Sequence, residues 1–176
     1  MRFVSAEEID KFVSPRDLVE ALRQGFAAAP LRSHFNMERS FEDDATFLIM
    51  PAWQKDGAAG VKVAAVVPGN SARGLPAVSG TYILLDGVTG QPSAVIDGTK
   101  LTTRRTAAAS ALATDYLARK DTREMVMVGS GAMAPNLINA HASVRPIKKV
   151  TIWNRNGDKA RALALETAAL GFDAVP

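Results

Sequence analysis

The stretch EMVMVGSGAMAPNLINA, Glu124 to Ala140, constrains the fold more than any other part of the sequence. Its apolar run predicts a short strand that ends at Gly-Ser-Gly, and a helical pattern begins directly afterwards. A second strand and helix follow in KKVTIWNR and GDKARALALETAALG, and FDAVP has the pattern of a third strand. Alternating strands and helices are typical of the parallel sheet of a doubly wound nucleotide-binding fold. The C-terminal part is therefore predicted to be the first part of a Rossmann sheet.

The turn after the first of these strands has the pattern G-x-G-x-x-A. The first glycine permits a tight turn, the second lets the backbone approach a pyrophosphate, and the final alanine allows close packing of helix on strand. The following helix would present its first amide groups to the phosphates. The predicted cofactor-binding residues are Gly129, Ser130, Gly131, Ala132, Met133 and Ala134. An ordinary turn without a ligand is the alternative.

The end of the second strand is where such folds distinguish NAD from NADP. An acidic residue there binds the free ribose 2′-hydroxyl of NAD, whereas an arginine can pair with the 2′-phosphate of NADP. This chain has WNRN, so Asn154 and Arg155 are predicted to bind the cofactor and NADP(H) is predicted to be preferred. NAD(H) as cofactor, with Arg155 as a solvated loop charge, is the alternative.

The region before the turn has a different pattern. Ser5 with Glu8, and Ser14 with Pro15, mark the starts of two helices. ATFLIMPAW, GVKVAAVVP, GTYILLD and PSAVID are short aliphatic runs separated by turns, which predict a mixed or antiparallel sheet. The segment MERSFEDD reads as a charged loop. A long alanine-rich helix, TKLTTRRTAAASALATDYLAR, and the polar connector KDTRE complete this region.

The predicted fold class is therefore α/β, with two domains. Residues 1–120 are expected to form an incomplete α+β substrate-binding and dimerisation domain, and residues 121–176 the N-terminal part of a Rossmann domain. An incomplete parallel sheet leaves an unpaired edge and an uncovered face. The chain is therefore expected to be part of a longer protein, and a small complete domain is the alternative.

Composition excludes several classes of function. Of 176 residues, 47% are hydrophobic and 22% charged, which suits a chain with a buried core. The net charge of +3 comes from scattered basic residues, so nucleic acid is not an expected partner. The absence of cysteine excludes disulfides and thiolate chemistry, and no apolar run is long enough to span a bilayer. No metal site is predicted, and a cytoplasmic location is expected.

Three stretches resemble the ornithine cyclodeaminase/mu-crystallin family. They are GVKVAAVVPGN, GLPAVSGTYILLDGVTGQPSAVIDGTKLTTRRTAAASALA and MVGSGAMAPNLINAHASVRPIKKVTIWNR. The combination of LT-x-x-RTAA with the later G-x-G-x-x-A turn is the most specific part. The resemblance implies a substrate and dimerisation domain joined to a Rossmann domain, and a homodimer at full length. It also implies an oxidoreductase that passes a hydride between a nicotinamide and an amino or imino acid.

The resemblance also implies roles for individual residues. Lys62 in GVKV matches the active-site lysine, Arg39 and Arg105 match arginines that hold the substrate carboxylate, and Thr106 lies beside the cofactor phosphates. Arginine suits a carboxylate because its guanidinium binds both oxygens. Surface positions are the alternative for these residues, and His34 and His141 are expected to be structural or surface residues. A further aspartate lies in the later half of family members, so residues 1–176 alone are expected to be inactive.

Departures from ornithine cyclodeaminase itself favour another member of the family. Ala77 stands where a cyclodeaminase has a substrate-contacting threonine, and Asn154-Arg155 replaces an acidic residue. The motifs WNR and GAMAP-x-LI-x-AHA-x-VRPI are similar to those of Δ1-pyrroline-2-carboxylate reductases. The predicted function is thus an NAD(P)H-dependent reductase of cyclic α-imino acids in proline metabolism. The alternatives are ornithine cyclodeaminase, and a mu-crystallin-like protein that binds NADPH and a small ligand without turnover.

Overall fold

The structure, a computed structural model, describes residues 1–28, 37–40, 45–54 and 57–176, with only the backbone of 37–40. These residues group into two compact units. The first comprises Met1–Phe12 and Ala28–Thr102, and the second comprises Val13–Ala27 and Thr103–Pro176. Each unit has its own sheet, of six strands in the first and three in the second.

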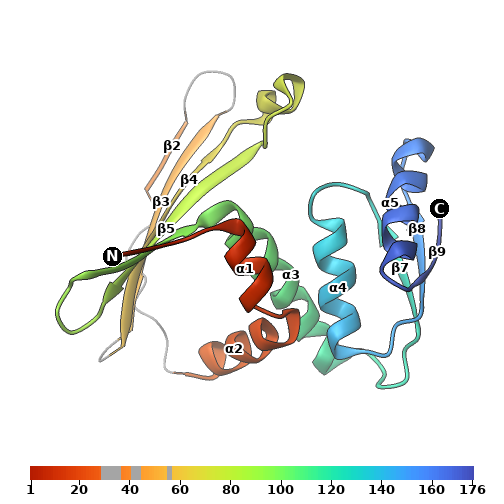
Figure 1. Ribbon diagram of the computed structural model, residues 1–176, viewed down its shortest axis with the longest axis horizontal. Coiled ribbons are helices and arrows are strands. Elements are labelled where there is room, and N and C mark those ends of the chain that lie inside the picture. Colours follow the sequence, from red (N-terminus) through yellow and green to blue (C-terminus); the bar gives the residue numbers. More distant parts are fainter. Residues whose placement is uncertain (29–36, 41–44, 55–56) are drawn as a thin grey trace. The chain divides into compact units, whose positions relative to one another are not determined.

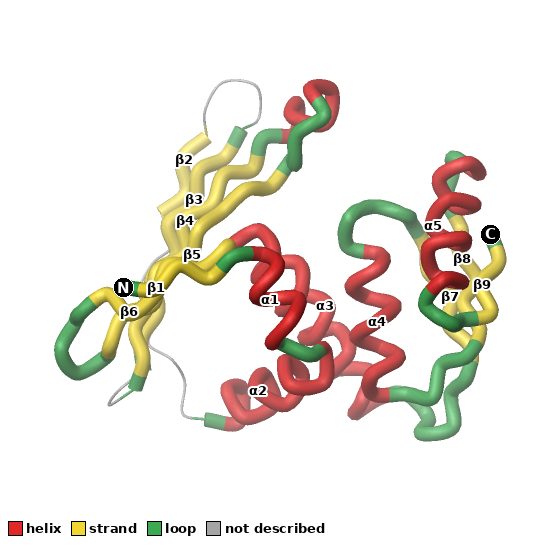
Figure 2. Tube along the Cα trace, viewed as in Figure 1, coloured by secondary structure: helices red, strands yellow, loops and turns green. Residues whose placement is uncertain are grey.

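The first unit is built on a mixed sheet with the strand order β1-β6-β5-β4-β3-β2 (Figure 1; β1 and β6 are labelled in Figure 2). The strands are β1 (Arg2–Val4), β2 (Met37–Ser40), β3 (Thr46–Trp53), β4 (Ala58–Val66), β5 (Val78–Asp86) and β6 (Pro92–Asp97), and the 3-10 helix η2 (Pro68–Arg73) joins β4 to β5. Neighbouring strands are antiparallel, except that β1 runs parallel to β6. The mixed sheet predicted from the short aliphatic runs is therefore confirmed.

Strands β1 and β2 lie where the sequence predicted no strand. Arg39, expected in a charged loop, lies in β2 opposite Phe47 of β3, so the loop interpretation is wrong at this position. Both strands pair with one neighbour within the described sheet, β1 with β6 and β2 with β3. Such short edge strands have too few residues to show a periodic pattern of their own, and they form because the neighbouring strand supplies the pairing.

Local capping fixes the ends of the elements in the first unit. In α1 (Ala6–Phe12) the Ser5 amide donates to Glu8 Oε2 over 3.0 Å, and the Glu8 amide donates to Ser5 Oγ over 3.3 Å. This is the reciprocal capping box that the sequence predicted. In the turn between β5 and β6, Asp86 Oδ1 accepts hydrogen bonds from the amides of Val88 and Thr89 over 3.0 and 2.7 Å.

In the second unit, α2 (Pro15–Ala27) packs with α3 (Gly98–Leu117) and α4 (Ala134–Val144). The residues of α3 up to Thr102 belong to the first unit. The buried cluster between these helices comprises Val19, Ala107, Ala108, Ala111, Leu112 and Ala140. The small residues of α3 therefore form a contact face that lets neighbouring helices approach closely. None of the described helices has the length and apolar character needed to cross a bilayer.

The second unit also contains a parallel sheet with the order β7-β8-β9 (Figure 2). Strands β7 (Glu124–Val128), β8 (Lys149–Trp153) and β9 (Asp173–Val175) alternate with helices α4 and α5 (Gly157–Ala169). One face of the sheet packs into a core that includes Val150, Ile152 and Leu163. On the other face, Val126 and Trp153 are 67% and 57% exposed. This order confirms the strand and helix alternation predicted for the start of a Rossmann sheet.

Candidate functional site

The turn between β7 and α4 has the backbone shape that its glycine pattern predicts. Gly129 has a φ of +103°, where a residue with a Cβ is strained. Its N–H donates to the carbonyl of Trp153 over 2.7 Å, which fixes the turn to the end of β8. The amide of Ala134 donates to the carbonyl of Gly131 over 2.9 Å. These two hydrogen bonds hold the turn at the carboxyl edge of the parallel sheet.

The second glycine of the turn, Gly131, faces open space. A Cβ placed there would meet no atom within 4 Å, so packing among the described residues does not require glycine. A pyrophosphate that approaches the backbone does require that space. Met133, the N-cap of α4, makes no side-chain cap hydrogen bond, so no cap competes with an anion for the first amides of the helix. The residues of the turn therefore fit the phosphates of a dinucleotide.

Asn154 connects this turn to the loop after β8. Its Nδ2 donates to Ser130 Oγ over 2.5 Å, and its Oδ1 accepts from the Asn156 amide over 2.9 Å. Asn156 in turn caps α5 by accepting from the amides of Asp158 and Lys159 over 3.0 and 3.2 Å. Both polar ends of the Asn154 side chain are thus used within the protein. A direct contact of Asn154 with the cofactor remains a prediction.

Two cations follow β8 near the glycine turn. Arg155 is exposed in the loop between Asn154 and Asn156. Lys159, in the first turn of α5, lines a pocket of about 260 Å³ whose other walls include Ser130, Gly131 and Glu166. The sequence pattern had indicated Arg155 alone as the cation of this site. Lys159 could have been recognised as a second candidate cation because it lies four residues after Arg155, in the first turn of the next helix.

Lys62 lies near the middle of β4, between two neighbouring strands. It is paired with Met50 of β3 and with Tyr82 of β5. Directly opposed residues of antiparallel strands project from the same face, so these three side chains share one face of the sheet. Lys62 and Tyr82 are both partly buried. Burial raises the pKa of the Tyr82 phenol, which keeps its proton on the oxygen.

The other predicted substrate and phosphate residues lie in both units. Arg39 is placed by its backbone in β2, and its side chain lies outside the described part. Arg105 is exposed on α3, and Thr106 beside it is partly buried. The preceding Arg104 donates instead to the carbonyl of Val13. Lys62 is described in the first unit and Arg105 in the second, so their roles at one site remain predictions.

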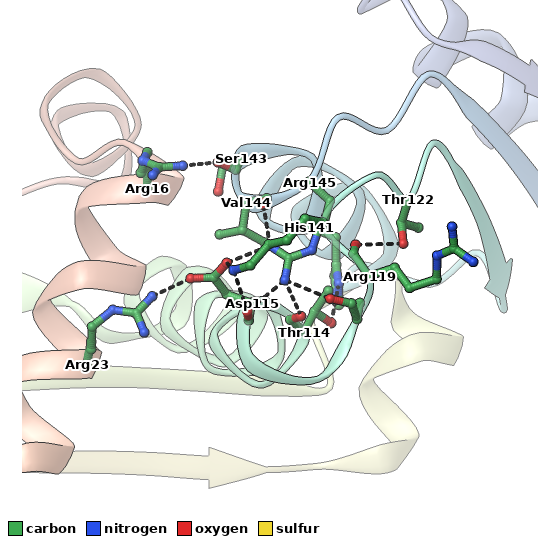
Figure 3. A network of polar contacts seen from close by, with 12 residues as sticks. Arg16, Arg23, Thr114, Asp115, Arg119, Thr122, His141, Ser143, Val144 and Arg145 are labelled. Carbon is green, nitrogen blue, oxygen red and sulfur yellow. Dashed lines mark hydrogen bonds and ion pairs between the residues drawn. The ribbon is translucent and has the colours of Figure 1, made fainter.

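The arginine of the motif AHA-x-VRPI, Arg145, joins the ends of two helices (Figure 3). It is only 4% exposed, and its guanidinium donates to the carbonyls of Thr114, Asp115 and Ala118 over 3.0, 2.6 and 3.0 Å. The first two carbonyls lie in the last turn of α3 and the third directly after it, where most backbone carbonyls lack helical partners. That of Thr114 also accepts from the Ala118 amide over 2.9 Å. Arg145 therefore caps α3 from the end of α4, and sequence reasoning missed this role.

Asp115 completes the charge network around Arg145. Its two carboxylate oxygens pair with Arg145 and Arg23, each over 2.5 Å. The hydrogen bond from Arg145 is the main cause that lowers the pKa of Asp115 to about 2, and Arg23 adds to it. Because Arg23 lies on α2, this carboxylate joins three helices of the second unit. The network positions α3, which carries Arg105, against α4, which begins at the glycine turn.

His141 of α4 lies between two hydroxyl groups of α3. Its Nε2 is 3.1 Å from Ser110 Oγ and its Nδ1 is 3.0 Å from Thr114 Oγ1. Burial lowers the pKa of the imidazole, which favours the neutral ring. The histidine thus adds polar contacts between α3 and α4, the two helices whose ends Arg145 joins.

Together, fold and site define a class of protein: a mixed-sheet α/β unit combined with the opening strands of a dinucleotide-binding Rossmann sheet. The ornithine cyclodeaminase/mu-crystallin family model matches residues 1–175, and the chain belongs to this family. The resemblance inferred from the sequence motifs is therefore confirmed.

Individual relatives agree with this assignment. The Δ1-pyrroline-2-carboxylate reductase of Colwellia psychrerythraea is 35% identical over 176 residues, covering 97% of this chain and 55% of the relative. The structure of the Thermococcus litoralis Δ1-pyrroline-2-carboxylate reductase with NADH and L-proline matches with a TM-score of 0.87 and 31% identity, over 98% of this chain and 55% of that one. An archaeal alanine dehydrogenase dimer with bound NAD matches with a TM-score of 0.89 and 29% identity, over 99% and 55%. The chain thus spans about half the length of these proteins.

Proposed function

We propose that this protein is an NAD(P)H-dependent oxidoreductase that reduces small cyclic α-imino acids, with Δ1-pyrroline-2-carboxylate as the first candidate substrate. The observation that carries the proposal is the glycine turn, whose open space above Gly131 suits a pyrophosphate, in a chain similar to two reductases of this imino acid. Residues 121–176 would supply the first part of the cofactor domain, and residues 1–120 would serve substrate binding and dimerisation. The dimer of the similar alanine dehydrogenase supports a homodimer.

The proposed chemistry assigns a task to each predicted side chain. A bound nicotinamide would supply the hydride that reduces the carbon of the C=N bond. Arg39 and Arg105 would hold the substrate carboxylate, because a guanidinium binds both carboxylate oxygens, and this fixes the position of the reacting carbon. Lys62 would hold a proton at the imine nitrogen, which becomes the amine of the product. Thr106 would contact the cofactor phosphates.

We further propose that NADP(H) is preferred over NAD(H). Arg155 and Lys159 are two exposed cations at the end of β8 and the start of α5, and the loop WNRN has no carboxylate to repel a 2′-phosphate. Charged hydrogen bonds to a phosphate typically contribute about 1.5–3 kcal/mol each. The similar solved structures contain NADH or NAD, so they support a nicotinamide cofactor in general.

The test of the proposed function mixes the full-length protein with Δ1-pyrroline-2-carboxylate and either NADPH or NADH. We expect loss of the reduced-nicotinamide absorbance and formation of proline, with the lower KM for NADPH. Arg155→Gln should raise the KM for NADPH by about tenfold or more and leave that for NADH nearly unchanged. Arg161→Gln is the matched control, because Arg161 is an exposed α5 cation paired with Asp158.

Two outcomes would replace the proposal. Proline and ammonia formed from ornithine, without reduction of the imino acid, would identify an ornithine cyclodeaminase. Tight NADPH binding without turnover of any imino or amino acid would identify a binding protein of the mu-crystallin kind.

A further inference from the structure

Tyr82 stands beside the proposed active-site lysine. The strand register pairs Tyr82 of β5 directly with Lys62 of β4, and β4 and β5 run side by side in Figure 1. Opposed side chains in such a pair lie on one face and within contact distance of each other. Within the described part of the chain, the phenol hydroxyl has no hydrogen-bond partner, although the ring is half-buried. Its hydrogen-bonding capacity is thus available to a ligand.

A glycine makes room for this phenol. A Cβ at Gly60 would lie 2.2 Å from the Tyr82 hydroxyl oxygen and 2.6 Å from the ring carbon that bears it. Any larger residue at position 60 would therefore displace the ring. Gly60 is two residues before Lys62 in β4, a distance of roughly 7 Å along a strand. The hydroxyl thus lies within side-chain reach of Lys62, on the same face of the sheet.

We propose that Tyr82 is a substrate-contacting residue whose hydroxyl donates a hydrogen bond to the carboxylate of the imino acid held at Lys62. This role rests on the proposed function. A carboxylate fits because it is the anionic group of the substrate, and a protonated phenol beside a lysine offers it a second, uncharged donor. Gly60 acts as a positioning residue, since it determines where the phenol can lie.

The test uses the full-length protein with NADPH and Δ1-pyrroline-2-carboxylate, and compares Tyr82→Phe, Gly60→Ala and the double variant. Tyr82→Phe should raise the KM for the imino acid about tenfold, as expected for loss of one hydrogen bond to a charged group. The KM for NADPH and the melting temperature should change little. Gly60→Ala should raise the same KM by displacing the phenol, and the double variant should show no further increase because the hydroxyl is already lost. Tyr116→Phe is the control, since Tyr116 is an exposed residue of the second unit.

The outcomes separate this role from the proposed function. Turnover by the wild-type protein with an unchanged KM in Tyr82→Phe would overturn the role of Tyr82 alone. Additive increases in the double variant would also overturn it, because they would show that Gly60 acts independently of the hydroxyl. If the wild-type protein reduces no imino acid, the proposed function fails, and the role of Tyr82 fails with it.

Discussion

The side-chain amide of Asn154 and the hydroxyl of Ser130 lie 2.5 Å apart, so one hydrogen bond joins the loops that follow β7 and β8. One of these loops is the glycine turn, and the other carries Arg155. In the proposed cofactor site, the first loop holds the pyrophosphate and the second distinguishes the ribose. The hydrogen bond therefore sets the spacing between the two parts of the site.

Asn154→Ala should weaken the binding of NADH and NADPH to a similar extent. Loss of one hydrogen bond of about 0.5–1.5 kcal/mol corresponds to an increase in Kd of roughly 2- to 12-fold. Fluorescence titration with each cofactor measures this. Asn70→Ala is the control, because the Asn70 side-chain amide likewise donates one hydrogen bond to a nearby loop, at the Pro76 carbonyl of the first unit. A loss confined to NADPH would show that Asn154 contacts the 2′-phosphate itself.

The two glycines of the turn should respond differently to alanine. Gly129→Ala forces a Cβ onto a backbone with φ of +103°, so we expect a loss of about 1–3 kcal/mol in the free energy of unfolding. Gly131→Ala should leave that free energy nearly unchanged, because a Cβ there meets no atom within 4 Å, but it should weaken cofactor binding at least tenfold. Denaturant unfolding and cofactor titration measure the two effects. Unimpaired binding by Gly131→Ala would contradict a pyrophosphate at this turn.

Arg145→Met should strongly destabilise the second unit. The substitution removes a buried donor to two carbonyls of α3 and to that of Ala118 directly after it, and it leaves Asp115 without one of its two ion-pair partners at 2.5 Å. Breaking a buried ion pair typically costs about 3–5 kcal/mol. The control is Arg119→Met, because Arg119 is an 83% exposed partner of Asp121 and such pairs contribute about 0–1 kcal/mol. Urea unfolding that shows equal losses for both variants would contradict the capping role.

The pH dependence of stability should carry the signature of Asp115. Its pKa is about 2 in the folded protein against an ordinary value of 3.8, so its contribution is fully present above about pH 4. This contribution, on the order of 2 kcal/mol, is lost as the pH falls from about 4 to about 2. The difference in unfolding free energy between wild type and Asp115→Asn should therefore shrink over that window. A constant difference would mean that the carboxylate is not stabilised by Arg145 and Arg23.

The elements that the sequence predicted well are those specified by local patterns. The glycine turn follows from Gly129 and Gly131. Its flanking strand and helix follow from the spacing of apolar residues, which changes from a strand pattern to a helical pattern within a few residues. The capping box at Ser5 and Glu8 is likewise a matter of neighbouring residues. The family motifs then assigned roles to Lys62 and Arg105, which local patterns alone left open.

The features that the sequence did not predict depend on contacts between distant segments. Strand β1 exists because Phe3 pairs with Val95, and no local pattern carries that information. The capping role of Arg145 requires the end of α4 to meet the end of α3, and the position of Tyr82 requires the register of β4 and β5. Each of these is fixed by tertiary packing, which overrides weak local preferences.

Helix α3 runs without interruption from Gly98 to Leu117, and the boundary between the compact units falls inside it, after Thr102. A recombination event at this boundary would join the first turn of α3 from one gene to the rest of the helix from another. The new helix would have to retain both its first turn, where the Lys100 amide donates to Asp97 Oδ1 over 2.7 Å, and the alanine face that packs on α2. The second unit also includes residues 13–27, so a single crossover could not transfer it intact. The two units are therefore expected to be inherited together, as one genetic module.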